Sequence, residues 1–229
     1  MVKKAFTDNK TACISVAVLF WGIIYLLDMQ FICELLLKIF PLELLQEYIE
    51  VVFYGGFFIA MLIVFRGVLL DDLKYFIANR NKCFSLCAGF FIVTLVLMVA
   101  SAIILDSNGI GNSENQEGID SLLEQYGILQ LVTVCVIGPV VEEICYRGIF
   151  FSFINGKNKT SLFRGIAAVI LTALFFALNH VSADMTVYDI LANIPIFMLG
   201  LTLSTLYLKT DNIYCPILVH IAINTMASL

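Results

Sequence analysis

Two neighbouring carboxylates and an arginine stand inside an apolar stretch of this 229-residue sequence, GPVVEEICYRGIF, residues 138–150. Moving a charge out of water costs several kcal/mol unless the charge is paired or solvated. Glu143 and Arg147 are four residues apart, so on a helix they share a face and can neutralise each other. Glu142 is turned by about 100° from Glu143 and lacks that partner. An unpaired carboxylate in such a helix is a candidate general base or metal ligand.

Both histidines of the sequence also fall in apolar stretches, and each has a second residue at helical spacing. His220 and Asn224 are four residues apart, so an imidazole and a carboxamide project together. His180 follows Phe176 by the same spacing, which lets the aromatic ring support the imidazole. Histidine titrates near neutral pH and binds metals, so this placement is informative. Three segments therefore each offer one short polar face.

The dipeptide Gly138–Pro139 precedes the two glutamates. Proline lacks an N–H and disrupts the preceding helical turn, so we expect a kink or a new helix start at this point. A new start would place Glu142 and Glu143 in the first turn of a helix, where the helix dipole favours negative charge.

Each of these features also has a purely structural interpretation. Glu143 and Arg147 can form a buried structural ion pair, which is compatible with chemistry at Glu142. His180 can lie at the membrane interface, and Asn224 can join two helices through a hydrogen bond. Glu142 has no comparable alternative.

The composition indicates that the elements carrying these residues lie in a membrane. The sequence is 61% hydrophobic and 14% charged, with a mean hydropathy of +0.96. A soluble domain has about 45–50% apolar and about 25% charged residues. We therefore expect an all-α polytopic membrane helix bundle of about seven transmembrane helices, each near the ~20 residues that cross a ~30 Å hydrocarbon core. The expected helices are residues 11–27, 51–70, 83–105, 128–154, 164–182, 189–208 and 213–229.

The connections between these helices carry further information. Residues 31–50 mix leucines with acidic residues, and we expect them to lie in the interface or to extend the second span. Basic residues alternate between connections, and the polar loop 106–120 has none. The positive-inside rule then predicts a cytoplasmic N-terminus and a C-terminus on the other side. The seven cysteines form no CxxC pair and are expected to be packing residues.

The three motifs together resemble the CPBP family of CAAX proteases and bacteriocin-processing enzymes, also called the Abi family. They are Glu142-Glu143-x3-Arg147, Phe176-x3-His180 and His220-x3-Asn224. Each motif alone is a weak signal, and the three in this order on successive helices are a specific one. The resemblance covers residues 120–229, which predicts a CAAX-protease-like core in the last four helices. Residues 1–119 are expected to form N-terminal transmembrane helices without a motif.

This resemblance implies an intramembrane protease of a bacterial cell membrane. Its expected substrate is a membrane-embedded or lipidated peptide, and no nucleic acid is expected as a partner. In such enzymes the first glutamate and the first histidine hold and activate the attacking water. The second histidine and the asparagine stabilise the oxyanion, and the second glutamate and the arginine support them. The implied catalytic residues are Glu142, Glu143, Arg147, His180, His220 and Asn224.

Participation of a metal stays an alternative on the sequence alone. Glu142, His180 and His220 would make a two-histidine, one-carboxylate set typical of catalytic zinc sites, with a fourth position for water. No HExxH motif places two histidines on one helix, and Asn224 is a poor zinc ligand. These two points favour a glutamate mechanism without a metal.

Two other classes of function are also compatible with an apolar helical chain. A non-catalytic immunity or regulatory membrane protein of the same fold would bind a peptide or a sensor kinase, although binding alone does not need a water-activating set. A proton-coupled transporter would use Glu142 and the histidines as a relay. It would also require acidic groups spread through the depth of the membrane, which the first three spans lack.

Overall fold

The computed structural model describes residues 5–26, 43–111, 127–156, 161–181 and 185–228, and no strand occurs among them. A short 3₁₀ turn, Phe6–Asp8, leads into α1, Lys10–Leu26. The next helices are α3 (Glu43–Val64), α4 (Arg66–Ala78) and α5 (Arg80–Ser107). An all-helical fold confirms the class expected from the composition.

The C-terminal half begins with one long helical segment, Gly127–Asn155. It contains two π-helical stretches, Thr133–Ile137 and Ile144–Phe151, and α7 (Gly138–Glu143) between them. The segment ends with α8, Ser152–Asn155. The remaining helices are α9 (Leu162–Leu178), α10 (Val187–Ala192), α11 (Ile194–Thr210) and α12 (Tyr214–Ala227).

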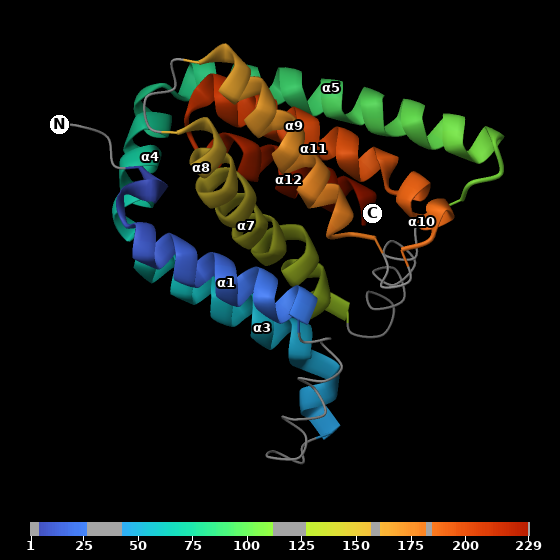
Figure 1. Ribbon diagram of the computed structural model, residues 1–229, viewed down its shortest axis with the longest axis horizontal. Helices are drawn as coiled ribbons and strands as arrows, with labels where there is room; N and C mark the ends of the chain where they lie inside the picture. Colours follow the sequence, from blue (N-terminus) through green and yellow to red (C-terminus); the bar gives the residue numbers. More distant parts are fainter. Residues whose placement is uncertain (1–4, 27–42, 112–126, 157–160, 182–184, 229) are drawn as a thin grey trace.

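The segment that carries the two glutamates lies between two groups of helices (Figure 1). On one side α1 and α3 run next to each other, α1 against the second π-helical stretch and α3 against α7. On the other side α9, α11, α12 and α5 pack together. Buried side chains from both groups and from the central segment form one apolar core. From Thr133 onward the central segment is therefore contacted from both sides, and its Glu143 and Arg147 are fully buried.

Two of the described helices, Arg80–Ser107 and Gly127–Asn155, are long and apolar enough to cross a membrane. A third span results if α3 and α4 are counted as one bent span. Helices α9 and α11 have 17 residues each and α12 has 14. At 1.5 Å per residue these are about 21–26 Å long, somewhat short of a ~30 Å core. A membrane helix bundle is confirmed, and the count of seven spans stays a prediction.

The second expected span, residues 51–70, is wrong at its C-terminal end. The helix stops at Val64 and the chain turns by 80° into α4. Phe65 leaves helical geometry there, with φ −100° and ψ 12°. Its buried ring packs against Phe6 at a centroid distance of 5.2 Å, which holds the bend in place. At the other end, residues 43–50 extend this helix, as one of our two alternatives predicted, and residues 31–42 lie outside the described part.

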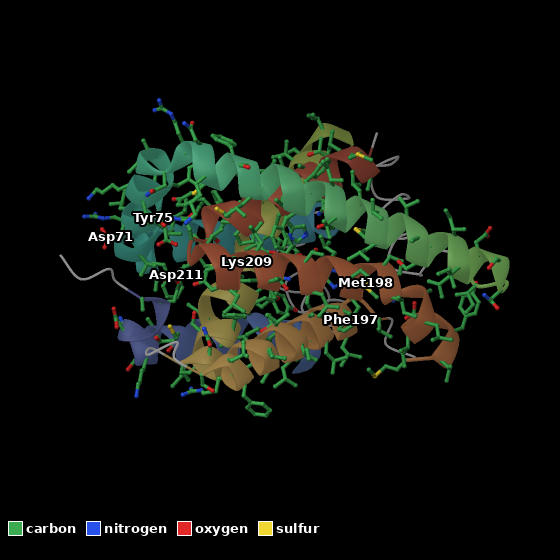
Figure 2. All side chains as sticks on the ribbon, turned by 90° about the horizontal axis from the view of Figure 1, so that it is seen from above. Asp71, Tyr75, Phe197, Met198, Lys209 and Asp211 are labelled. Carbon is green, nitrogen blue, oxygen red and sulfur yellow. The ribbon has the colours of Figure 1, made fainter. Side chains whose placement is uncertain are left out.

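Helix α4 is tied to the turn between α11 and α12 by a buried carboxylate. Asp72 is 1% exposed, and its Oδ2 accepts a hydrogen bond of 2.8 Å from the backbone N–H of Ile213. The Nδ2 of Asn212 donates to the carbonyl of Asp72 at 2.6 Å. In Figure 2 this end of α11, marked by Lys209 and Asp211, lies near α4. These bonds fix where α12, which carries His220, begins.

The cysteines behave as packing residues where the structure describes them. Six are free and buried, in helices α1, α5, α12 and the segment 127–155, and Cys33 lies outside the described part. None of the six forms a disulfide, as expected from the absence of a CxxC pair, and the thiols of Cys13, Cys87 and Cys135 donate hydrogen bonds to nearby oxygen atoms.

Helices α9 and α11 approach closely at one glycine. A Cβ atom added to Gly200 would lie 3.0 Å from the Cα and 3.2 Å from the carbonyl oxygen of Ala173. Small residues allow such close approach of helix backbones in membrane proteins. This crossing brings the carbonyl of Gly200 within reach of the central segment.

We expect Gly200→Ala to lower the free energy of unfolding by about 1–3 kcal/mol, because the added methyl group must push α11 away from α9. Gly89→Ala is the matched control. Gly89 is an exposed glycine in α5 with no atom within 4 Å of an added Cβ. Thermal unfolding of both variants in detergent measures the difference. Equal stability of the two variants would contradict the close crossing.

Candidate active site

The helix that carries the glutamates does not restart at Pro139. The N–H of Gly138 bonds to the carbonyl of Thr133, five residues back, and both Ile137 and Gly138 keep helical dihedral angles. A wide π-helical turn accommodates the proline ring, which would otherwise meet the carbonyl four residues earlier. Of the two alternatives expected at Pro139, a kink or a new helix start, the new start is wrong, and Glu142 is not in a first turn. Such π-helical turns are frequent at functional sites.

The ion pair expected from the spacing is present and fully buried. The Nη1 of Arg147 donates to the Oε1 of Glu143 at 2.6 Å, and both side chains are 0% exposed. The Nε of Arg147 donates to the Oγ of Ser204 at 3.3 Å, and Nη2 donates to the carbonyl of Gly200 at 3.1 Å. The guanidinium also lies 4.8 Å from the centre of the Phe176 ring. Helix α11 therefore supplies the remaining acceptors of a buried cation.

Two residues of α11 that bind the arginine were not among the residues expected at the site. Gly200 and Ser204 are four residues apart, a spacing of small residues that indicates close helix packing. Nothing in that spacing points to an arginine as the partner. The contact connects residues 53 and 57 positions apart, so only the folded chain reveals it.

His220 is fixed by the same buried carboxylate. Its Nδ1 lies 2.9 Å from the Oε1 of Glu143, and its side chain is 2% exposed. A carboxylate paired with Arg147 can only accept hydrogen bonds, so the Nδ1 of His220 carries the proton and donates it. The other ring nitrogen, Nε2, faces the Oε2 of Glu142 at 3.8 Å. A carboxylate that fixes the tautomer of a histidine in this way is common in catalytic and metal sites.

His180 lies in the turn after α9 and is oriented by the backbone of the last turn of that helix. Its Nδ1 lies 2.8 Å from the carbonyl oxygen of Phe176. Because a carbonyl oxygen only accepts, this nitrogen carries the proton and Nε2 keeps its lone pair. The ring of Phe176 contacts His180 at a centroid distance of 4.7 Å and His220 at 5.7 Å. The expected support of His180 by Phe176 is present, and the same ring also contacts the second histidine.

Glu142 is the least engaged of the charged residues in this cluster. Its side chain is 14% exposed, and it forms no hydrogen bond with the residues that the structure describes. Its Oε2 faces the Nε2 of His220 at 3.8 Å. The sequence predicted that Glu142 has no cationic partner one turn away, and the structure agrees with this prediction.

Asn224 lies one turn after His220 on α12 and reaches back to the central segment. Its Nδ2 donates to the carbonyl of Val134, in the first π-helical stretch, at 3.0 Å. One N–H of the amide is thereby used, and the second has no partner within the described part of the chain. The helix-joining role considered from the sequence is present, and one donor stays available.

The available nitrogen atoms of the two histidines suit a metal ion, but the positions of the side chains do not. In both histidines Nδ1 forms a hydrogen bond, so Nε2 remains as the nitrogen that could bind a metal ion. Among the described residues, however, no group of three or more histidine, cysteine, aspartate or glutamate side chains is placed to hold one ion. The arrangement of Glu142, His180 and His220 therefore does not form a complete metal site.

The N-terminal helices contribute aromatic packing behind the glutamates. Trp21 of α1 contacts Tyr146 and Phe150 at centroid distances of 5.8 Å and Phe175 at 5.3 Å. These rings lie on the central segment and on α9, the two elements that carry the first two motifs. Part of the chain that has no motif of its own therefore holds the motif-bearing helices together.

Comparison with known proteins addresses the resemblance directly. Residues 124–226 match the family described as "Type II CAAX prenyl endopeptidase Rce1-like", and all three motifs lie in that range. Over this segment, somewhat less than half of its length, the chain is similar to the CPBP family expected from the motifs.

Two curated proteins are similar to the chain. It is 29% identical over 175 residues to the "Putative membrane peptidase YdiL" of Bacillus subtilis, covering 73% of this chain and 66% of the relative. It is 26% identical over 102 residues to an "Uncharacterized 24.3 kDa protein" of Escherichia coli, covering 44% of each. The chain thus spans slightly less than two thirds of the first relative and under half of the second. No solved structure matches it.

We expect Arg147→Ala to reduce folding and expression strongly, because it leaves the buried Glu143 carboxylate without its cation. Removal of one partner of a buried pair typically costs about 3–5 kcal/mol. Asn224→Ala is the control, since it removes a neutral, partly buried amide from a neighbouring helix. Expression yield and thermal stability in detergent measure both. Normal folding of both variants with activity lost would instead give Arg147 a direct role in catalysis.

Proposed function

We propose that this chain is an intramembrane endopeptidase that hydrolyses a peptide bond of a membrane-associated or lipidated substrate with a water activated by Glu142. The observation that carries this proposal is the contrast between the two adjacent glutamates. Glu143 is buried and bonded to Arg147 and His220, whereas Glu142 is partly exposed and faces His220 at 3.8 Å. The family match and the peptidase relative support the same class of reaction.

In the proposed reaction Glu142 acts as general base and then as general acid. It takes a proton from the water as the water oxygen forms a bond to the carbonyl carbon of the substrate, and the carbonyl oxygen becomes an oxyanion. The C–N bond then breaks, and Glu142 returns the proton to the departing amine. The products are a carboxyl group and an amine. The Nε2 lone pair of His180 accepts a hydrogen bond from the attacking water and orients it.

Asn224 and His220 are the proposed donors to the oxyanion. Asn224 contributes the N–H that is not bonded to Val134. A neutral His220 ring has its one N–H proton on Nδ1, where it is hydrogen-bonded to Glu143. His220 donates from Nε2 only as an imidazolium, which takes its second proton from solvent before the reaction and keeps both protons throughout it. Preorganised donors of this kind typically contribute about 2.7–4 kcal/mol each to the stability of the transition state. No step is assigned to a metal, since the described residues do not bring three ligands together.

We expect Glu142→Gln to abolish cleavage, by about 10²–10⁴-fold or more, because the amide cannot accept the proton. The variant keeps shape and hydrogen bonding, so thermal stability and substrate binding should stay near those of the wild type. Two probes serve in detergent micelles: a prenylated fluorogenic peptide with a CAAX end, and a membrane-peptide library read by mass spectrometry. Full turnover by Glu142→Gln would overturn the assignment of the base.

The same purified proteins test the metal alternative. We expect the wild type to contain no stoichiometric zinc and to keep its activity after dialysis against a chelator. His180→Ala and His220→Ala are the comparison variants for elemental analysis. Zinc at one equivalent in the wild type that is lost in both variants would replace the glutamate mechanism with a metal-assisted one.

A further inference from the structure

Helix α9 ends in a second polar side chain directly beside His180. Asn179 caps the C-terminus of this helix, with φ −69° and ψ −12°. Both polar atoms of its side chain, Oδ1 and Nδ2, are shielded from solvent, and neither has a hydrogen-bond partner in the described part of the chain. A buried donor and acceptor left unpaired lower the stability of the folded state. Such a side chain in a native protein calls for an explanation.

The geometry of α9 places this amide on the interior side of the helix. At about 100° per residue, Asn179 lies about 20° from Thr172 and about 60° from Phe176. Thr172 is 0% exposed and Phe176 is 1% exposed, so this face points into the protein. His180 follows Asn179 in the turn after α9, and its ring lies 4.7 Å from the ring of Phe176. Asn179 and His180 are therefore neighbours at the end of the helix that carries Phe176.

We propose that the carboxamide of Asn179 binds the backbone of the peptide substrate, its Nδ2–H donating to a substrate carbonyl and its Oδ1 accepting from a substrate N–H. This inference rests on the proposed function, because it needs a peptide beside His180. A carboxamide has one donor group and one acceptor group, which match the two groups of a peptide unit. An extended peptide in an apolar environment brings the same unpaired groups with it.

A peptide unit of the substrate can bond to the Nδ2–H and the Oδ1 of Asn179 at the same time. These two bonds form only when substrate is bound. Thr172, seven residues earlier on the same face, also has a buried hydroxyl oxygen without a partner. It lies about two turns from His180, away from the end where cleavage is proposed. Thr172 is thus a matched control: the same helix face and the same unpaired state, without proximity to the reacting groups.

The test compares Asn179→Leu with Thr172→Val, each of which keeps the number and branching of the side-chain heavy atoms. We expect both variants to unfold at the same or higher temperature than the wild type, since each loses an unpaired polar group. Asn179→Leu should raise KM about tenfold with a smaller change in kcat. Thr172→Val should leave both constants unchanged. The probe is the prenylated CAAX peptide or, if the wild type prefers it, the best-cleaved peptide of the membrane-peptide library.

A backbone scan of that probe identifies the partner of the amide. Replacing single N–H groups of the peptide by N-methyl groups should reveal one position that weakens cleavage by the wild type but not by Asn179→Leu. Such coupling in a double-mutant cycle indicates direct contact. Unchanged KM in Asn179→Leu, with cleavage by the wild type intact, would mean that the amide serves structure or binds only water. Absence of cleavage by the wild type itself would overturn the proposed function instead.

Discussion

The buried pair of Glu143 and Arg147 is the interaction on which the arrangement of the site depends. A buried ion pair stabilises a fold only if its remaining donors and acceptors are also satisfied. Here α11 supplies a hydroxyl and a carbonyl to the guanidinium, and the aromatic ring of Phe176 lies against it. One arginine thus joins the central segment to α11 and α9. The same Glu143 oxygen that binds this cation also receives the Nδ1 proton of His220, which adds α12 to the assembly.

This arrangement gives two adjacent glutamates different environments. Glu143 is fully buried and accepts hydrogen bonds from both an arginine and a histidine. Glu142 points away from the arginine, keeps some exposure and has no such bonds among the described residues. Pairs of carboxylates in which one is committed to structure and the other is available are typical of acid–base sites. The environment of each residue, more than its chemical type, divides the roles that we propose.

The features that the sequence could predict are those set by local spacing. The apolar runs, the pairing of Glu143 with Arg147 and the placing of Phe176 beside His180 all follow from a helical period. The bend at Phe65 was not predictable, because it depends on packing against Phe6, far away in the sequence.

Contacts between distant segments could not be predicted from local spacing either. Glu143 and His220 are 77 residues apart, and their hydrogen bond depends on how α12 packs against the central segment. The motifs predicted that these residues meet, through the family resemblance, but not which atom bonds to which. The π-helical turns around α7 have no signal in composition beyond Pro139, whose effect was expected to be a kink or a new helix start. The wider turn keeps the helix continuous and leaves both glutamates in its interior.

The central claim is that acceptors fix the tautomers of both histidines, so that each has Nε2 available for the reaction. The sequence contains only two histidines, so nitrogen-15 labelling of histidine gives a spectrum with two imidazoles to assign. Magnetic resonance of the protein in detergent or lipid reports directly which ring nitrogen is protonated, with His180→Ala and His220→Ala providing the assignment. The account predicts a protonated Nδ1 in both rings. An unprotonated Nδ1 in His220 would contradict it, because the histidine could not then donate to Glu143.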